Sequence, residues 1–168
     1  MTHDDLRQLL DKQAITERLL DYARGVDLID PDLIASVFHE DATLDYGSMF
    51  TGTGREFADF IAAVHPAMET TSHHLSNTYI HVDGDQAGSE TYIIMLGRMK
   101  SSEGELSDTF SRGRYLDQWE RRDGHWRVSA RHYLHSADDT RPVGSAGFPV
   151  LGSRDHNDPS YAILGGTR

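Results

Sequence analysis

Two side chains with acid–base chemistry fall at positions where the pattern of the predicted elements favours an apolar residue. Asp27 follows Val26, just past the first predicted helix, and His73 lies at the start of the first long predicted strand. A carboxylate that accepts a hydrogen bond from one imidazole nitrogen fixes the tautomer and raises the basicity of the other nitrogen. An Asp27–His73 pair would therefore suit proton abstraction from carbon near neutral pH.

Three further polar side chains are candidates for the same site. Tyr46 lies in the strand-like phrase LDYG, Arg131 lies in the last predicted strand, and Tyr22 lies one turn before the end of the first helix. A tyrosine hydroxyl or an arginine fork can hold a carbonyl oxygen or a developing negative charge. We expect Tyr46 and Arg131 to do so during elimination or double-bond migration. Both tyrosines also suit ordinary core packing.

Each remaining candidate has an interpretation without catalysis. Asp27 would serve as a cap for the helix or for the turn that follows it, and Arg131 would pair with an acid such as Asp117 on a neighbouring strand. His74 is the alternative imidazole. Because adjacent strand residues face opposite ways, only one of His73 and His74 can face the interior, and the T-x-H phrase favours His73.

The composition narrows the class of protein. A length of 168 residues suits one domain with one core. The sequence contains no cysteine, which excludes disulfides, thiolate metal sites and cysteine nucleophiles. The formal net charge of -11 repels phosphate backbones and argues against nucleic-acid binding. Because no signal-peptide pattern and no long apolar run is present, we expect a cytoplasmic protein with no membrane partner.

Ten histidines raise the question of a metal site. His132 and His135 are three residues apart, and on a strand this spacing places them on opposite faces. The run HED at 39–41 has ligand chemistry but precedes a predicted strand in a loop. The GTG at 52–54 lacks the strand–turn–helix setting of a dinucleotide motif. We therefore expect neither a metal nor a cofactor.

The hydrophobic pattern predicts helices first and strands afterwards. Gly25 is expected to interrupt the first helix, and Asp30 followed by Pro31 predicts the N-cap and first position of a second one. Asp-Gly pairs at 83–84 and 123–124 predict tight hairpin turns. The predicted helices are 4–25, 31–37 and 55–64. The pattern changes to β from residue 70, and the predicted strands are 42–47, a long one that runs through 78–82 to the first tight turn, 91–99, 112–121 and 126–134.

This order of elements indicates an α+β fold. We expect a cone-shaped barrel, made of a strongly curved antiparallel sheet that N-terminal helices cover, over residues 1–136. Residues 137–168 are rich in glycine and proline. They are expected to form a C-terminal tail that packs on the domain or on a neighbouring subunit.

The sequence also resembles the SnoaL-like branch of the nuclear-transport-factor-2-like superfamily, over roughly residues 8–136. The phrases that carry the resemblance are ARGVDLIDPDLI (23–34), HEDATLDYGSMF (39–50), TSHHLSN (71–77), VDGD (82–85) and YLDQWERRDGHWRV (115–128). The resemblance implies the same helix-covered, cystatin-like sheet. It also implies catalytic roles for Asp27, His73, Tyr46 and Arg131, as in family members that eliminate water or hydrogen chloride.

The resemblance implies substrate-contacting positions as well, which are Tyr22, Val26, Phe50 and Tyr115. The residue types depart from those of the family at several of them. Val26 stands where one member has a tyrosine, Tyr115 where it has an asparagine, and Tyr22 where another has a lysine. The dyad therefore transfers to this chain, whereas the substrate does not.

Together these features predict a cofactor-independent lyase, dehydratase-like, or an isomerase. Its substrate would be a small, largely apolar molecule that bears a carbonyl or hydroxyl group. The alternatives are a non-catalytic small-molecule-binding or oxygenase-partner subunit of the same fold, and a hydrolase whose base activates water. Apolar and aromatic residues expected on the outer sheet face predict a homo-oligomer, a trimer or a dimer.

Overall fold

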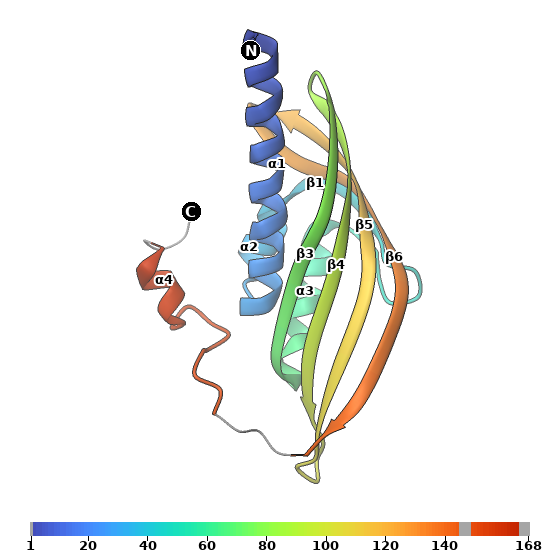
Figure 1. Cartoon of the computed structure of the whole chain (residues 1–168), viewed down its shortest axis with the longest axis vertical. Helices are drawn as coiled ribbons and strands as arrows, with labels where there is room; N and C mark the ends of the chain where they lie inside the picture. The colour runs from blue at the N-terminus through green and yellow to red at the C-terminus, as the bar shows by residue number, and fades with distance from the viewer. Residues whose placement is uncertain (1, 145–148, 165–168) are drawn as a thin grey trace.

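The computed structural model describes residues 2–144 and 149–164. A six-stranded sheet in the order β2-β1-β6-β5-β4-β3 curls around one side of the molecule, and α1 runs along its β3 edge (Figure 1). The helices are α1 (His3–Leu28), α2 (Pro31–Ser36), α3 (Gly54–Val64), the single 3-10 turn η1 (His65–Ala67) and α4 (Pro159–Ile163), and the strands are β1 (Phe38–Asp45), β2 (Thr51–Gly52), β3 (Met68–Asp83), β4 (Gln86–Lys100), β5 (Leu106–Arg122) and β6 (His125–Val143).

The predicted α+β class, with a curved sheet and N-terminal helices, is confirmed. Two details of the predicted barrel differ. The sheet is curled but not closed, because β2 and β3 form its two edges and do not pair with each other. The sheet is also not entirely antiparallel, since β1 runs parallel to β6. The chain can join these two strands in parallel because the whole β3–β5 meander lies between them in sequence.

Helix α1 is longer than the sequence pattern predicts. Gly25 does not interrupt it; the helix continues to Leu28 and ends where Ile29 adopts a left-handed conformation with φ 53°. A Cβ at Gly25 would lie 2.9 Å from Cγ1 of Ile34, so the glycine allows α2 to pack closely against α1. Asp27 consequently lies in the last turn of α1, not past its end.

The predicted start of α2 is confirmed, and α3 begins at Gly54, one residue before its predicted start. Asp30 caps α2, because its side chain accepts a hydrogen bond of 2.9 Å from the backbone N–H of Leu33. Thr53 caps α3 in a capping box with Glu56. These caps fix where α2 begins after α1 and where α3 begins after β2.

The strands of the meander extend well beyond their predicted ends. β5 and β6 remain paired from Arg122 and His125 to Leu106 and Val143. The added segments are mostly polar and partly exposed on both faces, so they lack the alternation by which a strand is recognised. Residues 137–143 therefore belong to the sheet, although the sequence pattern assigned them to the tail.

The core lies between the concave sheet face, α1 and α3. It is built from Ile15, Leu19, Tyr22, Val26, Ile34, Val37, Phe38, Ala42, Leu44, Tyr46, Phe57, Ala58, Ile61, Ile93, Tyr115, Trp119, Trp126 and Val128. Among the described helices, none combines the length and the apolar character needed to cross a membrane.

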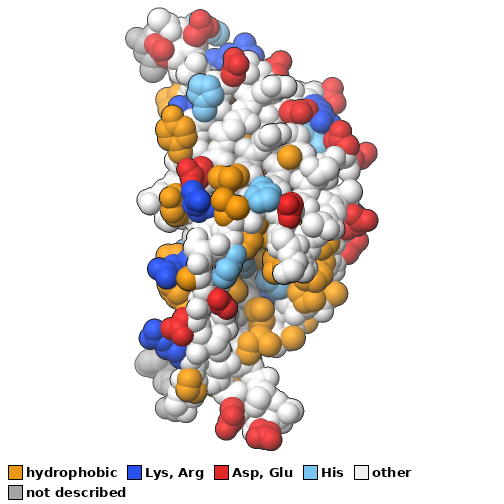
Figure 2. All heavy atoms as spheres, turned by 90° about the vertical axis from the view of Figure 1, so that its right-hand side faces the viewer, with side chains coloured by type: hydrophobic (Ala, Val, Ile, Leu, Met, Phe, Trp, Pro, Cys, Tyr) orange, Lys and Arg blue, Asp and Glu red, His pale blue; other side chains and the backbone are white. Residues whose placement is uncertain are grey.

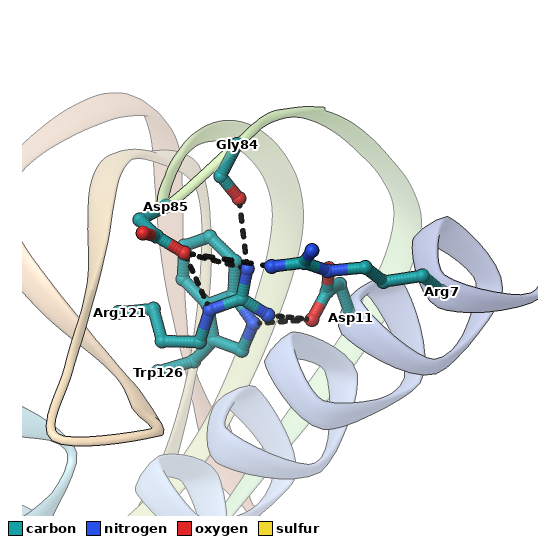
Figure 3. Close-up of polar contacts among 6 residues, drawn as sticks. All are labelled: Arg7, Asp11, Gly84, Asp85, Arg121 and Trp126. Carbon is teal, nitrogen blue, oxygen red and sulfur yellow. Dashed lines mark hydrogen bonds and ion pairs between the residues drawn. The ribbon is translucent and has the colours of Figure 1, made fainter. Parts of the chain in front are cut away.

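A polar cluster ties α1 to the sheet beside the β3–β4 turn (Figure 3). We call it the hairpin-end cluster; it comprises Arg7, Asp11, Gly84, Asp85, Arg121 and Trp126. The Asp11 carboxylate accepts hydrogen bonds from the Arg121 guanidinium at 2.5 Å and from the Trp126 indole at 2.9 Å. Arg121 also donates to the Asp85 carboxylate and to the Gly84 carbonyl. Its guanidinium therefore links α1 to the β3–β4 turn.

Candidate active site

The last turn of α1 and the beginning of β3 bring Asp27 and His73 together. Oδ1 of Asp27 lies 2.6 Å from Nδ1 of His73, and Oδ2 accepts a hydrogen bond of 2.8 Å from the His73 backbone N–H. Both oxygens of one carboxylate are thus bound to the same residue. This arrangement fixes the imidazole relative to the helix more firmly than a single contact would.

The sheet topology explains why a backbone N–H is available there. β3 is an edge strand, so the N–H groups that point away from β4 have no strand partner. The N–H of His73 is one of these, and Asp27 satisfies it. The edge position therefore lets a helix side chain reach both the backbone and the ring of His73.

The contact determines the state of both groups. Burial alone would raise the pKa of the Asp27 carboxyl, but hydrogen bonds from the His73 ring and backbone, the charge of that ring and a hydrogen bond from Thr71 together lower it. An ionised Asp27 only accepts hydrogen bonds, so Nδ1 of His73 carries the proton. In the neutral imidazole Nε2 is then the basic nitrogen, and no group within residues 2–144 and 149–164 hydrogen-bonds to it.

The choice between the two adjacent histidines follows from their exposure. The His73 side chain is 9% exposed and contacts Asp27, whereas His74 is exposed and lies 2.7 Å from the Ser72 hydroxyl. Alternation along β3 turns the two rings to opposite faces. The sequence-based preference for His73 agrees with this geometry.

A second imidazole, which the sequence interpretation missed, lies beside the dyad. His65 stacks on His73 with ring centroids 6.3 Å apart and an interplanar angle of 13°. Burial, helped by the charges of His73 and Arg154, lowers the pKa of His65 to about 4. Nδ1 of His65 is buried with no hydrogen-bond partner among the described residues. Nothing in the local sequence HPA distinguishes this histidine from an ordinary helix end.

The other predicted polar residues meet one another deeper in the core. The hydroxyls of Tyr22 and Tyr46 lie 2.8 Å apart, and the Arg131 guanidinium lies over the rings of Tyr22 and Tyr115 at 4.2 Å and 4.1 Å. We call these four residues the tyrosine–arginine cluster. Among the described residues, no hydrogen bond joins it to Asp27 or His73.

Arg131 is paired, as its alternative interpretation predicts. Its Nε and Nη2 donate to Asp117 at 2.7 Å and 2.8 Å, and both side chains are 0% exposed. Only Nη1 is left without a partner in the part of the chain that the structure describes. The Asp117 charge, which offsets burial, raises the pKa of Arg131 and keeps it cationic.

The remaining predicted substrate contacts are mostly core residues. Val26 and Tyr115 are buried, and Tyr115 packs edge-on against Tyr22 with centroids 5.5 Å apart. Phe50 is half-buried and packs against Phe57 with centroids 5.2 Å apart. Of these positions, Phe50 therefore retains the most surface for contact with another molecule.

The described residues form no group of three or more histidine, cysteine or acidic side chains that would suit a metal ion. His132 pairs instead with Asp45, at 3.2 Å, and His135 with Asp138, at 3.4 Å. The described geometry instead pairs one half-buried carboxylate, that of Asp27, with one half-buried imidazole, that of His73.

Comparison with known proteins places the chain among related folds. The structure is similar to a candidate scytalone dehydratase from Novosphingobium aromaticivorans, with 26% identity, a TM-score of 0.70, and 83% of this chain and 93% of that chain covered. It is also similar to the hexachlorocyclohexane dehydrochlorinase LinA-type3 from Novosphingobium barchaimii, with 24% identity, a TM-score of 0.73, and coverage of 88% and 99%.

A third similar structure is a protein of unknown function with a cystatin-like fold from Nostoc punctiforme, with 22% identity, a TM-score of 0.63, and coverage of 76% and 92%. No curated protein sequence matches this chain. The model of the SnoaL-like domain matches residues 7–132, which is most of the sequence and includes Asp27, His73, Tyr46 and Arg131. The chain belongs to the SnoaL-like family.

Proposed function

We propose that this protein is a cofactor-independent lyase or isomerase in which His73 is the base and Asp27 orients it. The observation that carries the proposal is the double contact of the Asp27 carboxylate with the ring and the backbone of His73. A contact of this kind keeps the proton on Nδ1 and leaves Nε2 as the nitrogen that accepts a proton. The similarity to a candidate dehydratase supports elimination as the reaction class.

The proposed reaction begins with removal of a proton from carbon by Nε2 of His73. The electrons of that C–H bond form a carbon–carbon double bond, and a hydroxyl group on the neighbouring carbon departs with its bonding electrons. The imidazolium returns the proton to the departing oxygen, so that water leaves and the base is regenerated. In an isomerase the same proton would return to a different carbon. Asp27 balances the charge on the ring throughout.

The tyrosine–arginine cluster is the proposed second part of the site. Tyr46, through its hydroxyl, and Arg131, through the unpartnered Nη1, would stabilise the oxygen on which negative charge develops. The substrate is proposed to be small and largely apolar, because the half-buried side chains around the core here are aromatic or aliphatic, among them Phe50, Phe60, Leu75 and Tyr133.

The adjacent histidines provide a matched test. His73→Gln and His74→Gln change the same side chain at neighbouring positions, but only His73 contacts Asp27. We expect His73→Gln to lower turnover by about 10²- to 10⁴-fold and His74→Gln to leave it unchanged. The assays would be loss of water from a panel of hydroxy-ketones, loss of chloride from hexachlorocyclohexane, and exchange of carbon-bound hydrogen in deuterated water.

Equal activity of the two variants would exclude His73 as the base. Turnover in none of the assays, together with saturable binding of the same compounds that His73→Gln leaves intact, would favour the alternative of a non-catalytic binding subunit. Deuterium exchange is the most general of these readouts, because it needs only proton abstraction and no leaving group.

The assembly is also a proposal. Alternation along β4 and β5 turns Tyr92, Leu96, Phe110 and Leu116 away from the core, and all four are exposed. Figure 2, which views the molecule from the β6 side, shows apolar side chains gathered among polar ones on this face. We propose that copies of the chain cover this face in a trimer or dimer, and a measurement of molar mass in solution tests it.

A further inference from the structure

One guanidinium from the C-terminal segment lies directly behind the dyad. Nε of Arg154 donates to the Asp27 carbonyl at 3.0 Å, and Nη1 donates to the carbonyls of His65 and Met68 at 3.0 Å and 2.9 Å. Nη2 donates to the Thr71 hydroxyl at 2.9 Å. Four hydrogen bonds thus converge on a side chain that is distant from the dyad in sequence.

The four acceptors belong to three different segments. Asp27 lies in the last turn of α1, His65 is the first residue of η1, and Met68 and Thr71 lie at the beginning of β3. These are the segments that carry the Asp27 carboxylate, the stacked imidazole and the His73 ring. An arginine fork presents five N–H donors in a rigid plane, which is why one residue can hold three segments in a fixed relation.

The segment around Arg154 is itself attached to the domain. The Tyr161 hydroxyl donates to the Asp30 carboxylate at 3.1 Å. Arg24 donates to the Ser160 hydroxyl at 3.1 Å and lies over the Tyr161 ring at 4.8 Å. These contacts, all C-terminal to Arg154 in the sequence, anchor the tail on the ends of α1 and α2.

Thr71 links the guanidinium to the carboxylate. Its hydroxyl accepts from Arg154 and also contributes a hydrogen bond that lowers the pKa of Asp27. Arg154 therefore reaches Asp27 by two routes, through the backbone carbonyl and through the threonine hydroxyl. Any movement of the guanidinium would displace the carboxylate relative to the His73 ring.

We infer that Arg154 is a positioning residue of the active site, by which the C-terminal segment sets the distance and angle between Asp27 and His73. This inference rests on the proposed function of the dyad. Catalysis by an oriented base is sensitive to displacements of about 1 Å, which can cost on the order of 100-fold in rate. A residue that touches neither the substrate nor the ring can therefore control turnover.

The test uses the full-length chain and the variant Arg154→Lys. Lysine retains the positive charge but cannot form the planar set of four bonds. We expect kcat to fall by about 10- to 100-fold while KM changes little, because the residue orients the base and does not bind the substrate. The low-field NMR signal of the proton on Nδ1 of His73 should broaden or disappear, as it should in Asp27→Asn.

Arg141→Lys is the matched control, because Arg141 is an exposed residue of β6 that pairs with Asp139 on its own strand. It should retain both kcat and the NMR signal. Tyr161→Phe is a milder variant that loosens the segment without touching the acceptors of Arg154, and it carries the test if Arg154→Lys does not fold. It should change both readouts in the same direction by a smaller amount.

A loss of thermal stability with an unchanged signal and unchanged kcat would overturn the inference, because a purely structural tether would behave in that way. The NMR signal is read without substrate, so the two proposals can fail separately. If Arg154→Lys removes the signal and even the native protein turns nothing over, the positioning stands and the lyase proposal falls.

Discussion

Helix α1 carries two aspartates that meet the sheet at opposite ends, and their partners differ. Asp11 is bound by the Arg121 guanidinium and the Trp126 indole in the hairpin-end cluster. Asp27 is bound by the ring and backbone of His73. The two carboxylates are both largely buried, with 11% and 24% of their side chains exposed. Burial alone therefore does not distinguish structural from chemical use.

The partners make the difference. Guanidinium and indole groups only donate hydrogen bonds, so the partners of Asp11 offer no atom that could accept a proton. Imidazole gains and loses a proton in that range, and Asp27 occupies only one of its two nitrogens. A buried carboxylate therefore becomes a candidate for catalysis when its partner retains a free titratable atom.

The largest expected effect comes from removing each carboxylate in turn. Asp27→Ala should lower kcat by about 10³-fold, because His73 loses the group that orients and charge-balances it. Asp11→Ala should leave kcat nearly unchanged but reduce the free energy of unfolding by about 3 kcal/mol, since it leaves a guanidinium and an indole without their buried partner. Denaturant unfolding and turnover, measured on both variants, give the four values needed.

Asp27 and Asp11 would have the same role if both substitutions changed turnover and the free energy of unfolding in the same way. A stability loss at Asp27 as large as that at Asp11, with turnover retained by the folded fraction, would make the dyad a second structural pair. The assay should therefore be run well below the unfolding midpoint of the weaker variant.

The sequence predicts the contact made by Asp27 but not the contacts made by Asp11. Asp27 and His73 were identifiable because Asp27 stands between two apolar residues and both lie in phrases that resemble the SnoaL-like family. Asp11 was not, because its partners Arg121 and Trp126 come from β5 and β6, and contacts between distant segments leave no local pattern. The helix caps and hairpin turns were predictable, since each depends on a few neighbouring residues.

The residues behind the dyad were beyond sequence reasoning for the same reason. Arg154 lies in a glycine- and proline-rich segment with no periodicity, and its acceptors are mostly backbone carbonyls, which every residue possesses. Gly25 was misinterpreted as a helix end because its role is to admit Ile34, a contact between two helices. Helix continuation through a glycine depends on that packing and not on propensity alone.

A smaller expected effect is a pH dependence of stability, which His65 contributes at the Asp27 end of α1. Burial first, and then the neighbouring charges of His73 and Arg154, depress the pKa of His65 from 6.5 to about 4. The unfolded chain therefore binds a proton that the folded chain does not, and stability falls as the pH decreases below about 6.5. We expect a loss of about 2 kcal/mol between about pH 6.5 and about pH 5, at roughly 1.4 kcal/mol per pH unit.

His65→Phe isolates this contribution, because phenylalanine keeps a stacked ring beside His73 but does not titrate. Urea unfolding of the variant should vary less with pH over that interval than unfolding of the native protein. Asp11→Ala leaves His65 in place, so this variant should retain the native pH dependence over that interval. An equal slope in His65→Phe and in the native protein would show that folding does not lower the pKa of His65.

The smallest expected effect concerns the tyrosine–arginine cluster, which lies between the two ends of α1. The hydroxyls of Tyr22 and Tyr46 lie 2.8 Å apart, and each also interacts with one further member of the cluster, Tyr22 with Tyr115 and Tyr46 with Arg131. Tyr22→Phe and Tyr46→Phe should each reduce the free energy of unfolding by about 1 kcal/mol, and the double variant should lose less than the sum, because the same bond is counted twice. Additive losses in this cycle would mean that each hydroxyl is stabilised by another group. A further loss of turnover in Tyr46→Phe, beyond what its stability explains, would extend the chemical region from Asp27 into the cluster.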